Sequence, residues 1–97
     1  MIIKTEGVTR AVIERYGTKM QSVIAIEEMS ELTKELSKAI RGNDNHDAIV
    51  EELADVIICM IQIREMYRIK DEELQDRINS KLDRLRMRLS EAERECG

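Results

Sequence analysis

The sequence predicts an all-α protein. We expect a single domain spanning residues 1–97, a helical bundle built from a long antiparallel helix hairpin plus a C-terminal helix and completed by oligomerisation. Charged residues make up 37% of the chain and aromatic residues only 2%, and this balance, rich in Glu, Lys, Arg, Leu and Ile, favours helices. The chain contains no proline, so no proline interrupts a helix. Apolar residues recur at intervals of three and four, the period of a buried helix face.

Two helices are expected in the first half of the chain. The first covers about residues 8–16 and stops at Gly17. The second starts at Thr18, because Thr18-x-x-Gln21 has the spacing of a capping box. It runs to about residue 40, where Arg41-Gly42 supplies a glycine stop.

Two further helices are expected in the second half. The stretch "NDNHD", residues 43–47, is the loop, and Asn45 or Asp47 is the expected cap of the third helix, which ends near residue 67. Asp71 is the expected cap of a fourth helix that reaches about residue 93.

The third helix is apolar on nearly every side from residue 53 to residue 63. A helix that is apolar all round is buried all round, and a chain of 97 residues cannot bury one completely by itself. We therefore expect a homodimer or a dimer of dimers. The exceptions form one narrow polar stripe spaced three, four and three: Glu52, Asp55, Cys59 and Gln62.

The second helix carries carboxylates along the edge of its apolar seam. The seam comprises Ala25, Met29, Leu32, Leu36 and Ala39, and Glu28, Glu31 and Glu35 follow the same spacing on its flank. If the hairpin folds near residue 44, Glu31 lies level with about residue 57 and Glu35 with about residue 53.

These acids have two interpretations. Glu28-x-x-Glu31 alone is typical of a solvated helix flank. Opposite Glu52-x-x-Asp55, however, it would crowd carboxylates on one side of a buried hairpin, where they repel one another and lose hydration. A divalent cation relieves that conflict, and oxygen ligands favour Mg²⁺ or Mn²⁺ over zinc.

Charge and hydropathy exclude several classes of protein. The formal net charge of -4 argues against a general nucleic-acid binder. The N-terminal stretch lacks the apolar core of a signal peptide, and the longest apolar run, "VIICMI", is far too short to cross a bilayer. We expect no membrane partner and a cytoplasmic location.

The ordered motifs resemble a known family. "EEMSE" followed by "EELADVI" resembles the Glu-Glu-x-x-Glu and Glu-x-x-Asp signature of the MazG-like all-α nucleoside triphosphate pyrophosphohydrolases, and the resemblance covers about residues 16–88. It implies a helical bundle that dimerises and uses Mg²⁺ to split a nucleoside triphosphate into a monophosphate and pyrophosphate. By this resemblance the metal ligands are Glu28, Glu31, Glu52 and Asp55.

The remaining roles stay partly open. Glu27, Glu35 or Glu51 is the candidate catalytic residue that orients the attacking water, and the sequence does not choose among them. "INSKLDRL" resembles the family's Asn-x-Lys-x-x-Arg element, which implies that it binds substrate. Asn79 lies about 200° around the helix from Lys81, so both serve one site only if the pocket wraps that helix or a second subunit contributes. The candidate substrate-binding residues are Asn79, Lys81 and Arg84, together with Gln21, which is either a cap partner or a nucleotide contact.

Two other functions compete with this one. A phosphoribosyl-ATP pyrophosphohydrolase shares the helical architecture and acidic motifs, but its expected "DLLYH"-like run is here "DVIICM". A helical interaction module without catalysis would use the polar stripe to fix the register of an interface.

Overall fold

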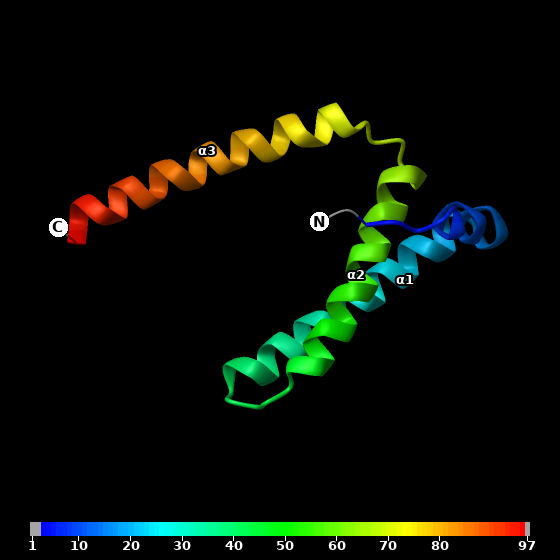
Figure 1. The fold of residues 1–97 in the computed structure, drawn as a ribbon, viewed down its shortest axis with the longest axis horizontal. Helices are drawn as coiled ribbons and strands as arrows, with labels where there is room; N and C mark the ends of the chain where they lie inside the picture. The colour runs from blue at the N-terminus through cyan, green and yellow to red at the C-terminus, as the bar shows by residue number, and fades with distance from the viewer. Residues whose placement is uncertain (1–2, 97) are drawn as a thin grey trace.

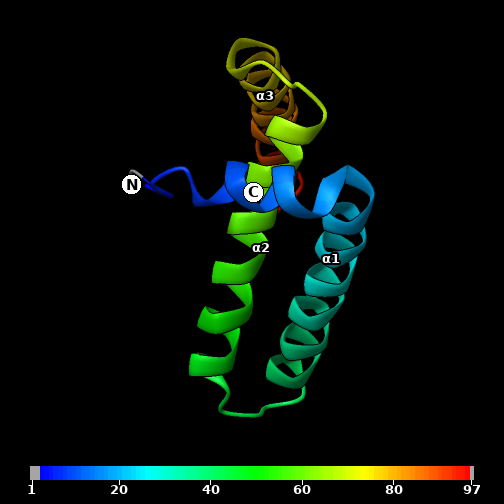
Figure 2. The ribbon, with the colours of Figure 1, turned by 90° about the vertical axis from the view of Figure 1, so that its right-hand side faces the viewer.

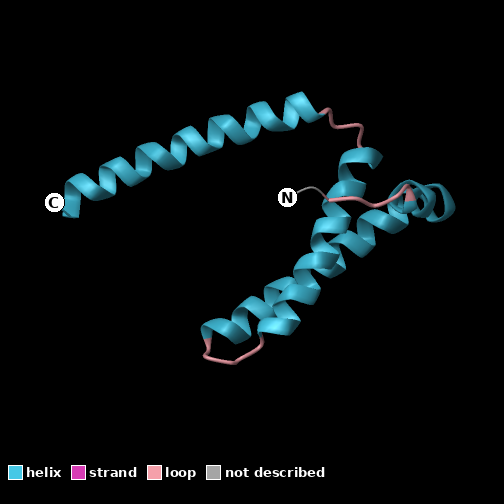
Figure 3. Ribbon diagram, in the orientation of Figure 1, coloured by secondary structure: helices cyan, strands magenta, loops and turns pink. Residues whose placement is uncertain are grey.

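The computed structural model describes residues 3–96, and its helices account for most of them (Figure 1). The order is α1 (Val8–Ile40), α2 (His46–Met66) and α3 (Asp71–Cys96). No strand occurs within the described range, as Figure 3 also shows. The prediction of an all-α protein is confirmed.

α1 consists of two helical segments that meet at Gly17. The backbone of Gly17 has φ 86° and ψ 162°, a conformation that is essentially restricted to glycine. Figure 2 shows the first segment turning sharply away from the rest of the helix at this end. The predicted stop at Gly17 is therefore present as a kink between two segments.

α1 and α2 lie side by side and run in opposite directions (Figures 1 and 2). Two hydrogen bonds fix their register: the Gln21 side-chain amide donates to Gln62 Oε1 at 3.4 Å, and the Ser22 and Tyr67 hydroxyls lie 2.7 Å apart. In this register Glu31 lies opposite Glu52.

The predicted register, with Glu31 level with about residue 57, is therefore wrong. The chain reverses at Arg41 and Gly42, where the backbone amides of both residues bond back to α1 and Gly42 adopts φ 96°. The fold point lies some two residues earlier than expected, which displaces the pairing by more than a helical turn.

The helix interface is small and unusually polar. Among the described residues, three hydrophobic side chains and four polar ones are buried. Met29 and Leu36, placed in the apolar seam by their spacing, are 43% and 47% exposed, so that part of the prediction is wrong. The stripe facing α2 is rotated toward the acids and comprises Gln21, Ala25, Glu28, Leu32 and Glu35. The buried side chains of α2 are Val56, Cys59 and Gln62.

α3 extends away from the hairpin (Figure 1). Across residues 3–96 it does not pack against α1 or α2. Only its start is tied down, through an ion pair between Arg64 and Asp71. The expected apolar seam of this helix is consequently exposed, with Ile78 and Leu82 each at 41%, Leu85 at 50% and Leu89 at 63%.

The chain is much more extended than a compact domain of its length. Its radius of gyration is 17.1 Å, against about 12.5 Å for a compact chain of this size. It exposes 8218 Å², whereas a folded monomer of this mass exposes about 5,700 Å². Among the described residues, no helix is both long and apolar enough to cross a membrane.

Candidate metal centre

Three carboxylates meet across the hairpin. Glu28 on α1 and Glu52 and Asp55 on α2 each place one oxygen so that all three oxygens lie within 4.8 Å of one another. Glu52 and Asp55 share a side of α2 because residues three apart are neighbours on a helix. The register set by Gln21 and Gln62 brings Glu28 opposite them.

The crowding changes how these acids titrate. Partial burial, followed by the nearby charge of Asp55 and a hydrogen bond with it, raises the pKa of Glu28 above 4.5. Burial and the charges of Asp55 and Glu31 raise the pKa of Glu52 in the same direction. Both effects favour the neutral acid over the carboxylate at Glu28 and at Glu52.

Glu31 borders this cluster without joining its tightest part. Its side chain is exposed, and it lies outside the group of three oxygens. Its charge nevertheless raises the pKa of both Glu28 and Glu52. A cation held by the three acids would therefore have a fourth carboxylate beside it.

Cys59 lies one turn along α2 from Asp55 and is only 5% exposed. Burial and the charges of Glu28 and Asp55 raise the pKa of its thiol. The thiol therefore stays protonated, and because a thiolate is the form that binds metal, the donors around this position are oxygens. Carboxylate oxygens suit Mg²⁺ or Mn²⁺.

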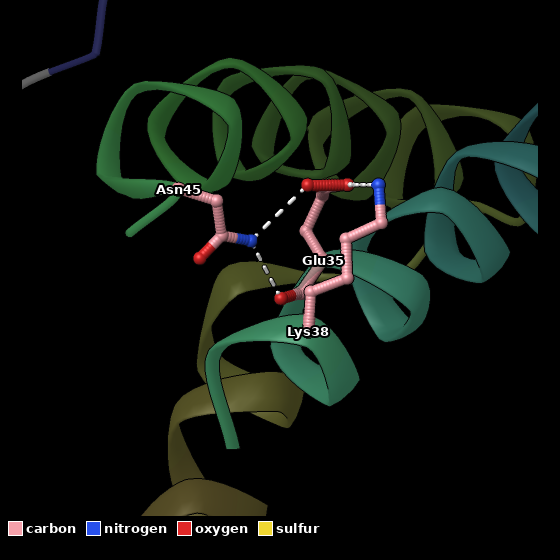
Figure 4. Close-up of polar contacts among 3 residues, drawn as sticks. All are labelled: Glu35, Lys38 and Asn45. Atoms are coloured by element: carbon pink, nitrogen blue, oxygen red, sulfur yellow. Dashed lines mark hydrogen bonds and ion pairs between the residues drawn. The ribbon is translucent and has the colours of Figure 1, made fainter. Parts of the chain in front are cut away.

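Glu35 makes its hydrogen bonds with residues outside the cluster (Figure 4), although its charge contributes to raising the pKa of Glu52. Asn45 donates its side-chain amide to Glu35 Oε1 at 3.1 Å and to the Glu35 backbone carbonyl at 2.9 Å, and Lys38 pairs with Oε2 at 3.1 Å. These bonds lower the pKa of Glu35. In the structure, this candidate catalytic residue therefore connects the end of α1 to the loop before α2 through hydrogen bonds.

Asn45 has a role that the sequence did not reveal. Asn45, one of the two expected caps, does occupy the N-cap position of α2, but its side chain makes no cap hydrogen bond. A cap bond would use the side-chain oxygen as acceptor, whereas Asn45 uses its Nδ2 group to donate to Glu35, a long-range contact that the local sequence does not predict.

The other two candidate catalytic acids, Glu27 and Glu51, are exposed. Each stands one position before a cluster acid, and consecutive helical residues point about 100° apart. The charge of Glu51 contributes to raising the pKa of Glu52. The geometry therefore leaves both candidates at the rim of the cluster.

Gln21 belongs to the helix interface. It is 3% exposed and hydrogen-bonded to Gln62, and among the described residues its Oε1 atom has no partner. The polar stripe of α2 thus continues past the acids as a buried amide pair.

The remaining substrate-binding candidates lie on α3. Asn79, Lys81 and Arg84 are exposed, and the Asn79 side-chain oxygen accepts a hydrogen bond from Gln75 at 3.0 Å. Because α3 points away from the hairpin (Figure 1), one chain does not bring these residues to its own acidic cluster.

The fold and the site together define an all-helical chain with carboxylates gathered across two antiparallel helices. The chain matches no protein-family model, no curated protein and no solved structure.

Proposed function

We propose that the protein is a Mg²⁺-dependent nucleoside triphosphate pyrophosphohydrolase that assembles as a homodimer or a dimer of dimers. The observation that carries the proposal is the meeting of Glu28, Glu52 and Asp55 within 4.8 Å. Bringing such groups together is unfavourable without a cation. The order and spacing of the acids also resemble the MazG-like family.

In this proposal Glu28, Glu52 and Asp55 hold the metal, with Glu31 beside them. Mg²⁺ held by these acids would neutralise charge along the triphosphate and lower the pKa of a water molecule. Glu27 or Glu51 would orient the attacking water toward the α phosphorus for in-line attack and accept its proton. The bond between the α phosphorus and its bridging oxygen breaks, and pyrophosphate leaves.

Lys81 and Arg84 are proposed to bind the phosphate chain. Both are cations on one side of α3, and phosphate oxygens accept charge-assisted hydrogen bonds from such groups. Since they are remote from the acids of their own chain, they serve the site through assembly of the chains.

The exposed apolar faces favour one alternative, a helical interaction module in which the acids fix register. A phosphoribosyl-ATP pyrophosphohydrolase activity remains the enzymatic alternative. A screen of nucleoside triphosphates and phosphoribosyl-ATP with Mg²⁺ and Mn²⁺ separates all three. We expect a monophosphate and pyrophosphate from a (deoxy)nucleoside triphosphate.

Variants test the site itself. Glu28→Gln, Glu52→Gln and Asp55→Asn should each lower turnover by about two orders of magnitude or more while the helical circular dichroism is kept. Glu14→Gln, an exposed acid on the first segment of α1, is the matched control and should leave turnover unchanged. Formation of a diphosphate and orthophosphate, or no turnover with any nucleotide and either metal, would favour the interaction module.

A further inference from the structure

Within residues 3–96, two apolar helix surfaces are not covered by another helix. The α3 seam, defined as Leu74, Ile78, Leu82, Leu85 and Leu89, spans about 22 Å along the helix. The far face of α2 is the side turned away from α1, with Val50, Ala54, Ile57 and Ile61 spaced four, three and four. It spans about 17 Å.

The far face of α2 is hollowed. Ala54, Ile57 and Ile58 line one hollow of about 370 Å³ together with five residues of the N-terminal segment of the same chain: Ile3, Lys4, Thr5, Val8 and Thr9. Ile57, Met60 and Ile61 line a second, of about 470 Å³, which Leu74 and Ile78 at the start of α3 also border. The seam of α3 therefore begins beside the surface that lacks a cover and then runs away from it.

We propose that α3 of one chain packs on the far face of α2 in a second copy of the chain, and that the exchange is reciprocal. Each chain has one seam and one far face, so a two-fold dimer covers both surfaces in both chains and leaves no open end.

The turn between the helices favours a second copy over the chain's own α2. Arg68 adopts φ 52°, the Ile69 amide donates to the Arg64 carbonyl at 3.0 Å, and Arg64 pairs with Asp71. These contacts direct α3 outward, so that its seam reaches a neighbouring chain rather than the hairpin it is attached to.

Charge favours this pairing over contact between two α3 helices. α2 carries one arginine, Arg64, and three acids outside the cluster that faces α1: Asp47, Glu51 and Glu65. The middle of α3 carries one acid, Asp83, and these bases: Arg77, Lys81, Arg84, Arg86 and Arg88. Opposite charges meet when α3 lies on α2, whereas two α3 helices would bring basic flanks together.

The area is large enough for a stable dimer. The 8218 Å² exposed exceeds that of a compact monomer by about 2,500 Å² per chain. Burying that excess from two chains gives an interface in the range of obligate dimers, roughly 2,000–5,000 Å² in total.

Cross-linking tests the exchange without any nucleotide, so its outcome is independent of the proposed function. In a Cys59→Ala/Cys96→Ser background, chains with Ala54→Cys and differently tagged chains with Arg86→Cys are refolded together and treated with a bismaleimide. We expect a covalent dimer containing both tags. Met87→Cys, on the side of α3 opposite the seam, is the matched control and should give none.

Three results would overturn the proposal. A single chain that carries both Ala54→Cys and Arg86→Cys could form the link within itself, which would mean that α3 folds onto its own hairpin. Arg86→Cys chains could link to one another, which would mean that α3 pairs with α3. No link could form at all. Light scattering adds a second measurement: Leu85→Asp should abolish the dimer, either as a monomer or by unfolding, whereas Met87→Asp should retain it.

Discussion

At the scale of single residues, the acidic cluster is unfavourable for the stability of the metal-free protein, and the same carboxylates are the proposed ligands of a cation. The pKa values of Glu28 and Glu52 are raised, which favours their neutral form. The pKa of Glu35 is lowered by its contacts with Asn45 and Lys38, which favours its charged form. The same residue type on the same hairpin thus titrates in opposite directions, and the neighbours decide which. This contrast provides two predictions.

The first prediction concerns Asp55. Asp55→Asn removes one charge from the cluster, so the melting temperature of the metal-free protein should rise. Mg²⁺ should stabilise the wild type by mass action, by about 2.7 kcal/mol at a hundred times the dissociation constant, and should not stabilise the variant. Differential scanning calorimetry with EDTA or Mg²⁺ measures both effects, with Glu14→Gln as control. An unchanged Mg²⁺ response in Asp55→Asn would remove this residue from the ligand set.

The second prediction concerns pH in the metal-free protein. A carboxyl whose pKa is raised by folding contributes stability below the unfolded value of 4.5, and that contribution is lost as pH rises through the folded pKa. Glu28→Gln should therefore raise the melting temperature at pH 7, and the gain should disappear as pH falls toward about 4.5.

Glu35→Gln is the matched opposite. The pKa of Glu35 is lowered, so its contribution is present above 4.5 and is lost as pH falls through the folded pKa. The variant should melt lower than the wild type at pH 7, and the difference should shrink in acid. Equal pH profiles for the two variants would show that the two acids do not differ in this way.

At the scale of elements, the sequence predicted where helices start and stop better than how they face each other. Gly17 and Arg41-Gly42 are local signals, since glycine alone adopts these backbone angles at little cost, and both appear at the expected positions. The pairing depends on where the chain reverses, and that point lies some two residues earlier than expected. The acid pairs on the two antiparallel helices were nonetheless enough to predict that Glu28 would meet Glu52 and Asp55, whereas Glu31, expected among them, lies outside the group of three oxygens.

The kink in α1 gives the third prediction. A side chain at Gly17 would meet no atom within 4 Å, so any cost of Gly17→Ala comes from the backbone alone. At φ 86° and ψ 162° that cost is about 1–3 kcal/mol. Urea unfolding should show this loss, while Lys19→Ala, at an exposed helical position, should be nearly neutral. A stabilised Gly17→Ala variant would mean that α1 is straight.

At the scale of the whole molecule, the part of the chain that the structure describes buries three hydrophobic side chains, Ala25, Val56 and Cys59, which are too few to stabilise a fold of this length. Folding must offset about 1–2 kcal/mol of backbone entropy per residue, and most of the apolar area available for that remains exposed. The position of α3 could not be predicted from the sequence, because an amphipathic helix shows which side is buried but not which surface covers it. The same limit applies to Lys81 and Arg84.

The last prediction is that stability depends on protein concentration. If the chains are folded only when assembled, a tenfold rise in protein concentration stabilises the folded dimer by about 1.4 kcal/mol. The melting temperature should therefore rise when the protein is concentrated and fall when it is diluted. Ile58→Asp would place an unpaired charge beside the hollowed face of α2 and should remove this dependence by preventing assembly. Ile40→Asp, at a position 87% exposed at the end of α1, is the control and should keep it. Melting that is independent of concentration, together with a folded monomer in sedimentation at micromolar protein, would mean that the isolated chain is stable and that its apolar faces need another explanation.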